Sequence, residues 1–127
     1  MTIRRALPAI LSLVVLIGAP LLQAQTDVSG TWMATFETQV GEQQYTFELV
    51  VKGTALTGTA KGNLMGETAI SDGKVDGETI TFVENATYQG MPLRITYTGT
   101  MTPAGEIAFT RNVADFATEE LVAKRSK

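Results

Sequence analysis

The sequence predicts an all-β fold, an eight-stranded antiparallel up-and-down β-barrel that follows an N-terminal signal peptide. After the first 24 residues threonine is frequent and proline is limited to Pro92 and Pro103, a composition that favours strands. Apolar and polar residues alternate with a period of two, and no window shows a helical stripe. Short connections separate the alternating runs, so neighbouring strands pair as hairpins and close most economically into a barrel.

The first 24 residues are predicted to be a secretory signal peptide. Arg4 and Arg5 form its positive start, residues 7–22 are apolar but too short and too interrupted by proline for a good spanning helix, and Ala24 offers a cleavage site. The alternative is an uncleaved membrane anchor. With cleavage, residues 25–127 form one domain that is exported to the periplasm or outside the cell and has no membrane span.

Each predicted strand carries residues two apart that share its inward face. In chain order these residues are Trp32, Ala34 and Phe36; Tyr45, Phe47, Leu49 and Val51; Leu56, Gly58 and Ala60; Ile70 and Val75; Ile80 and Phe82; Leu93, Ile95 and Tyr97; Ile107 and Phe109; and Leu121 and Ala123. Ile70 and Val75 are an odd number apart, so a bulge at Asp72-Gly73 is expected to turn both inward. Asp76-Gly77 is expected to form a two-residue type I′ turn.

Charge and composition exclude several classes of function. Without Arg4 and Arg5 the 10 basic residues fall to 8 against 13 acidic ones, a net charge of −5. This argues against nucleic acid and anionic membranes as partners. The chain has no cysteine and no histidine, so it lacks disulfides and the commonest general base and zinc ligand. No cofactor and no metal is expected; the acidic turn Asp72, Asp76 and Glu78 does not have the spacing of an EF-hand loop.

Three short motifs resemble known barrels. Residues 30–32 read GTW, which resembles the Gly-x-Trp of the first lipocalin strand. SGTW at residues 29–32 and LTGT at residues 56–59 also look like the first strands of avidins, and both families belong to the calycin group. The lipocalin resemblance implies that Trp32 packs under a basic residue of the last strand, here Arg125, and plugs one end. Because Trp32 is the only tryptophan, biotin binding is not implied.

The whole mature chain is also similar to short lipocalin-like domains of uncharacterised secreted bacterial proteins. Their pattern, LTG…ISDGKVDG…ITF…Y.G…AKR, is matched by residues 56–58, 70–77, 80–82, 97–99 and 123–125. The resemblance implies the barrel and no particular activity.

The end opposite the termini is the predicted binding mouth. Its connections carry apolar residues, namely Leu64, Met65, Met91, Val113 and Phe116. A methionine-containing rim that faces water suits an adaptable binding site. The alternative is that these side chains fold over and cap a filled barrel.

Two charged residues have inward parity in the mouth half of the lumen. Hairpin counting places Glu84 opposite Thr96 or Tyr97, and Arg111 opposite Thr96, so the charges lie level across one strand. Tyr45, Tyr88 and Tyr97 are expected to add hydroxyls there. Glu84 and Arg111 are either a structural ion pair or a pair that orients the polar head of a ligand; a register slip that turns one of them outward is a third alternative.

The sequence is compatible with three functions. The first is a module that binds a small apolar or amphipathic molecule through Tyr45, Met65, Glu84, Tyr88, Met91, Tyr97, Arg111 and Phe116. The second is a structural or interaction barrel with a filled core, whose apolar rim contacts a protein. The third is an isomerase-like or lyase-like enzyme with Glu84 as acid and base.

Overall fold

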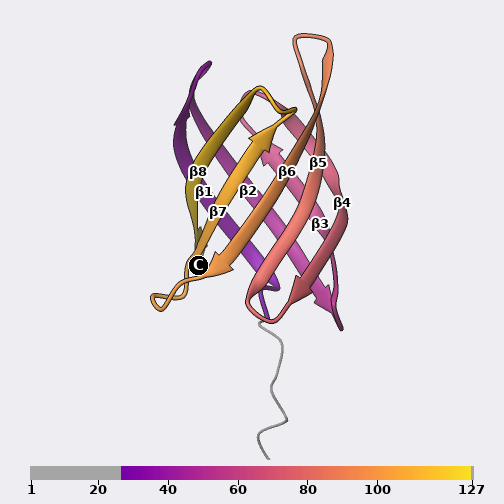
Figure 1. The fold of residues 1–127 in the computed structure, drawn as a ribbon, viewed down its shortest axis with the longest axis vertical. Coiled ribbons are helices and arrows are strands. Elements are labelled where there is room, and N and C mark those ends of the chain that lie inside the picture. Colours follow the sequence, from indigo (N-terminus) through magenta and orange to yellow (C-terminus); the bar gives the residue numbers. More distant parts are fainter. Residues whose placement is uncertain (1–26, 127) are drawn as a thin grey trace, which may run out of the picture.

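The computed structural model describes residues 27–126, which form a closed barrel of eight antiparallel strands in chain order. The predicted signal peptide lies outside these residues. Each strand pairs with its two neighbours in the sequence, and β8 returns to β1 (Figure 1). The strands are β1 (Gly30–Thr38), β2 (Gly41–Lys52), β3 (Ala55–Gly62), β4 (Gly66–Asp76), β5 (Thr79–Tyr88), β6 (Met91–Met101), β7 (Ile107–Val113) and β8 (Ala117–Arg125). The predicted fold class is therefore confirmed.

Aromatic rings fill the half of the lumen nearest the termini. The rings of Phe47, Phe82, Tyr97 and Phe109 lie with their centroids 4.5 to 6.0 Å apart, and all four residues are buried. Gly99 makes room for this cluster, since a Cβ there would lie 2.5 Å from the Phe109 ring. Stacked and edge-to-face ring pairs stabilise a core beyond the burial of their surface.

The predicted bulge in β4 is confirmed. The register of β4 against β5 shifts between Ser71 and Lys74, and Asp72 has a positive φ of 52°. The extra residue turns both Ile70 and Val75 inward, where they are buried.

The predicted position of the type I′ turn is wrong. Asp76 pairs with Thr79, so the two central residues of that turn are Gly77 and Glu78, of which only the glycine has a positive φ. One positive φ at the first central position is the pattern of a type II′ turn. Both central residues have positive φ in the β5–β6 turn instead, at Gln89 (52°) and Gly90 (80°).

This turn placement also corrects the predicted register. With Gln89-Gly90 as the turn, Glu84 pairs with Ile95 rather than Thr96 or Tyr97. The β6–β7 connection is a loop over residues 102–106 rather than a tight turn at Pro103-Ala104, so Arg111 pairs with Tyr97 rather than Thr96. Both charged side chains are fully buried, which excludes the register slip.

The two ends of the barrel can be recognised by the chain ends and by one long hairpin. In Figure 1 the C-terminus and the start of β1 lie at the lower end, and the β5–β6 hairpin extends furthest at the upper end. The pairing of β1 with β8 is short, Trp32 with Arg125 and Met33 with Lys124, and it lies at the lower end. Residues 27–126 contain no helix that is long and apolar enough to cross a membrane.

Candidate functional site

The upper end of the barrel contains a cavity of about 610 Å³. This volume lies in the range of sites for small organic molecules. The cavity is lined by residues from all four upper loops and the strand ends beside them: Thr38, Gln39, Val40, Gln43, Met65, Tyr88, Gln89, Met91, Leu93, Arg111, Val113, Phe116, Ala117 and Glu119.

Each upper loop, or the strand end beside it, exposes one large apolar side chain. Val40, Leu64, Met91 and Phe116 are 45%, 40%, 56% and 72% exposed. These side chains therefore do not fold inward to cap the barrel. Val40, Met91 and Phe116 line the cavity and form its apolar rim together with Met65, which packs partly against the core.

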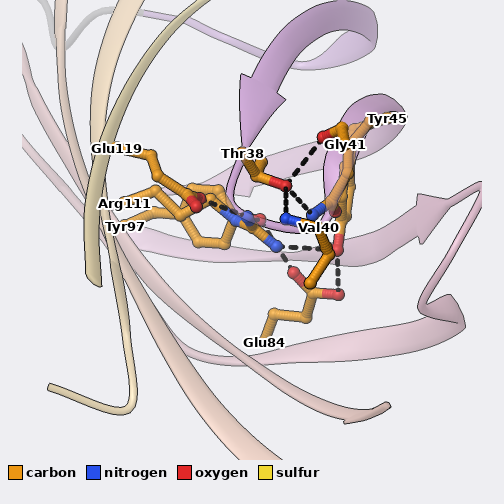
Figure 2. A network of polar contacts seen from close by, with 9 residues as sticks. Thr38, Val40, Gly41, Tyr45, Glu84, Tyr97, Arg111 and Glu119 are labelled. Carbon is orange, nitrogen blue, oxygen red and sulfur yellow. Dashed lines mark hydrogen bonds and ion pairs between the residues drawn. The ribbon is translucent and has the colours of Figure 1, made fainter. Parts of the chain in front are cut away.

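Arg111 forms the floor of the cavity, and its side chain is completely buried. Its Nη1 donates to Glu119 Oε1 at 2.6 Å, its Nε donates to the Tyr97 hydroxyl at 3.0 Å, and its Nη2 donates to the Tyr45 hydroxyl at 3.1 Å (Figure 2). The guanidinium carbon also lies 5.2 Å from the Phe36 ring centre and 5.1 Å from that of Tyr45. Hydrogen bonds and ring faces thus compensate the loss of water around this cation.

Glu84 lies beneath Arg111, and the two tyrosine hydroxyls stand between them. Tyr45 donates to Glu84 Oε2 at 2.8 Å and Tyr97 donates to Glu84 Oε1 at 2.7 Å (Figure 2). Arginine can only donate, so each tyrosine oxygen accepts from Arg111 and must direct its own proton to Glu84. Both carboxylate oxygens therefore accept, which is the hydrogen-bond pattern of an ionised Glu84.

Burial raises the pKa of Glu84 above its usual 4.5, while hydrogen bonds from Tyr97 and Tyr45 and the charge of Arg111 act in the opposite direction. Burial, followed by the charge of Glu84, raises the pKa of both tyrosines, so they remain protonated donors at neutral pH. Gly62 lets Tyr45 reach this position, since a Cβ there would lie 2.6 Å from the Tyr45 ring.

Gln43 is the one buried polar side chain of residues 27–126 with an unpartnered atom. The residue is 1% exposed and lines the cavity; its Nε2 donates to the Thr38 hydroxyl at 3.0 Å, and its Oε1 accepts nothing. A buried acceptor without a donor is unusual in a folded protein. It marks a position where a bound molecule or water can donate.

The predicted site residues separate into two groups. Met65, Tyr88, Met91, Arg111 and Phe116 line the cavity. Tyr45, Glu84 and Tyr97 do not line it; they lie below and hold Arg111.

The predicted ion pair of Glu84 with Arg111 is corrected by this arrangement. The carboxylate that contacts Arg111 directly is Glu119, and Glu84 reaches it through two hydroxyls. Glu84 is not among the residues that line the cavity, and the enzyme alternative stays a prediction.

Two residues of the site were missed in the sequence although the sequence contains their signal. Gln43 lies two residues before Tyr45 and thus shares its inward parity. Glu119 lies two residues before Leu121 and pairs with Arg111 across the β7–β8 hairpin. The alternation that identified the apolar core extends to both polar residues.

The opposite end of the barrel is sealed at the predicted plug. The Arg125 guanidinium lies 4.4 Å from the centre of the Trp32 ring, and Trp32 is fully buried. The indole donates to the Val28 carbonyl at 2.9 Å, and Arg125 donates to the carbonyls of Ser29 and Asp27 at 2.9 and 3.1 Å.

No group of acidic, histidine or cysteine side chains within residues 27–126 has the arrangement of a metal site. Comparisons with models of protein families, with curated protein sequences and with solved structures gave no significant match. The family resemblance thus stays a prediction. The structure supports the coarser statement, an eight-stranded antiparallel barrel compatible with a lipocalin-like fold.

Proposed function

We propose that this barrel binds a small apolar or amphipathic molecule in the cavity at its upper end. The observation that carries the proposal is the cavity of about 610 Å³ between an exposed apolar rim and a buried polar floor. Such a combination, mostly apolar with a few fixed polar groups, is typical of sites for small ligands. The filled aromatic half of the lumen limits the ligand to the upper half.

The proposal includes export. Arg4 and Arg5, the apolar residues 7–22 and Ala24 support a cleaved signal peptide, so the mature protein would meet its ligand in the periplasm or outside the cell. The measured mass of the mature protein tests this step, because cleavage after Ala24 leaves Gln25 as the first residue.

Native mass spectrometry of protein purified without denaturant tests ligand binding. We expect a bound small molecule, or a mass shift and thermal stabilisation with members of a panel of lipids and aromatic compounds. A clean unliganded mass with no stabilisation across the panel contradicts the proposal.

A matched pair of variants identifies the cavity as the binding site. Met91→Ser with Phe116→Ser removes two apolar side chains from the rim. Val50→Ser with Val122→Ser removes two exposed apolar side chains from the barrel wall, where they are 46% and 43% exposed. Ligand binding is expected to weaken in the rim variant and to remain in the wall variant.

The exposed rim also supports a second candidate, a contact with another protein. Phe116 and Met91 are the two most exposed large apolar side chains among the described residues. Under this alternative, cross-linking in the producing cell would capture a partner at rim positions, and the same rim variant would lose it while the small-molecule panel shows no binding.

A further inference from the structure

We propose that the cavity selects a ligand whose polar head donates an N–H hydrogen bond to Gln43 Oε1, an amine or an amide rather than a carboxylate. The inference rests on the proposed binding function and specifies its ligand class. It depends on the direction of the Gln43 amide, on the burial of its oxygen and on the charge of the cavity floor.

The direction of the Gln43 amide follows from the single proton of Thr38. The Thr38 hydroxyl donates to the Gly41 carbonyl at 2.8 Å, and its oxygen accepts from the Val40 amide at 3.2 Å (Figure 2). With its proton directed to Gly41, Thr38 accepts from Gln43 Nε2 at 3.0 Å, and the amide nitrogen faces it. The Gln43 oxygen is then the buried atom left without a donor, on a residue that is 1% exposed and lines the cavity.

The one cation of the cavity floor is already paired with a carboxylate. Arg111 is the one basic residue that lines the cavity among the described residues, and Glu119, Tyr97 and Tyr45 accept from three of its five N–H groups. Arg111 and Glu119, the two charged residues among those that line the cavity, form an ion pair. A carboxylate head would face the Glu119 carboxylate and the Gln43 acceptor oxygen, whereas an N–H group would donate to either of them.

Glu119 extends the acceptor surface toward the opening. Its side chain is 12% exposed and lines the cavity, and only its Oε1 is hydrogen-bonded to another described residue. Gln43 Oε1 and Glu119 Oε2 are therefore two acceptors on the wall of one cavity. A primary ammonium or a primary amide carries enough N–H groups to serve both.

Titration calorimetry with four straight-chain compounds tests the inference: decylammonium, decanamide, decanoate and decyl methyl ether. Their alkyl chains have nine or ten carbons, so differences in affinity larger than the contribution of one CH2 group, about 0.8 kcal/mol or about fourfold, report the head group. We expect the ammonium and the amide to bind about tenfold or more tightly than decanoate and the ether, the ratio that corresponds to one additional net hydrogen bond.

Two matched variants test the residue. Gln43→Met removes the acceptor and keeps an unbranched side chain, and it is expected to reduce decanamide affinity about tenfold while leaving the ether unchanged. Gln44→Met is the control, because Gln44 is the next residue of β2 and points outward. The selectivity of the wild-type protein stands as a test by itself if Gln43→Met does not fold.

The outcomes separate this inference from the proposed function. Binding of all four compounds with equal affinity, tighter binding of decanoate, or no effect of Gln43→Met overturns the N–H donor and leaves a binding cavity. Failure of all four to bind overturns the proposed function together with the inference.

Discussion

The two ends of the barrel place an arginine against aromatic rings with opposite results. At the lower end, Arg125 lies 4.4 Å from the Trp32 ring centre and donates to two backbone carbonyls, while the indole donates to a third. At the upper end, Arg111 lies against the Phe36 and Tyr45 rings at the floor of an open cavity, and Gln43, which also lines the cavity, keeps an unused acceptor. The lower end is closed by its own side chains, and the upper end leaves polar capacity for another molecule.

This comparison separates stability from binding. The lower end joins the first and last strands, so its contacts contribute to closure of the whole barrel. The upper rim is exposed and contributes little to the core. Substitutions at the two ends should therefore affect different measurements.

Trp32→Ala is expected to have the largest effect on the barrel. It removes the buried ring and the support for Arg125, and should lower the free energy of unfolding by about 3–5 kcal/mol. Chemical denaturation measures this loss. A loss below about 1 kcal/mol would show that the plug does not stabilise the barrel.

Arg111→Met is expected to lower the free energy of unfolding by about 3 kcal/mol, because it leaves the buried Glu84 charge without its cation. Arg94→Met is the control on the neighbouring strand. Arg94 is exposed, and its contact with the exposed Asp72 is long, at 3.9 Å, so its loss should cost little stability. Equal effects of the two substitutions would contradict the role of the buried network.

The pH dependence of stability tests Glu84 in its buried position. Because its pKa is raised above 4.5 in the folded state, the folded protein binds this proton more tightly than the unfolded chain. The free energy of unfolding of the wild type should fall as pH rises from 4.5 through the folded-state pKa, by at most about 1.4 kcal/mol per pH unit.

Glu84→Gln cannot titrate and should lack this component of the slope. Denaturation curves of both proteins between pH 4.5 and about pH 8 supply the comparison. A difference between them that is constant over this range would mean that Glu84 titrates alike in the folded and unfolded states.

Arg125→Ala should lower the free energy of unfolding by about 1 kcal/mol, the contribution of a cation over an indole at an exposed position. Lys124→Ala, one residue earlier and pointing outward, is the control, because its contact with Glu106 is long at 3.9 Å. A larger effect of the lysine substitution would contradict the plug.

Phe116→Ser should have the smallest effect on stability, below about 0.5 kcal/mol, because the side chain is 72% exposed. It should nevertheless weaken ligand binding at the rim. If the unfolding free energy falls by more than 1 kcal/mol, Phe116 belongs to the core of the barrel and is not a free rim residue.

Much of the fold could be predicted from the sequence, because alternation with a period of two reports directly which side chains face the lumen. Ile70, Val75 and the bulge between them follow from parity alone. The registers of Glu84 and Arg111 were wrong because they depend on the loops. Gln89 adopts a positive φ that its residue type does not signal, and the β6–β7 loop has five residues instead of two.

The sequence predicts at which height in the lumen the polar residues of the candidate site lie, but not which of them are hydrogen-bonded to one another. Inward parity placed Glu84, Tyr97 and Arg111 together, but the order of hydrogen bonds depends on side-chain rotamers across the lumen. The unpartnered oxygen of Gln43 depends on where the Thr38 proton points, which only the hydroxyl geometry reveals.

The division of the barrel into a sealed end and a binding end is tested most directly by NMR titration with decanamide. The single tryptophan gives one indole N–H signal, which reports the lower end, and the Gln43 side-chain amide reports the upper end. The account predicts that the Gln43 signals and the backbone amides of Met65, Met91 and Phe116 shift, while the Trp32 indole signal stays in place. A shift at Trp32 with an unchanged Gln43 would contradict it.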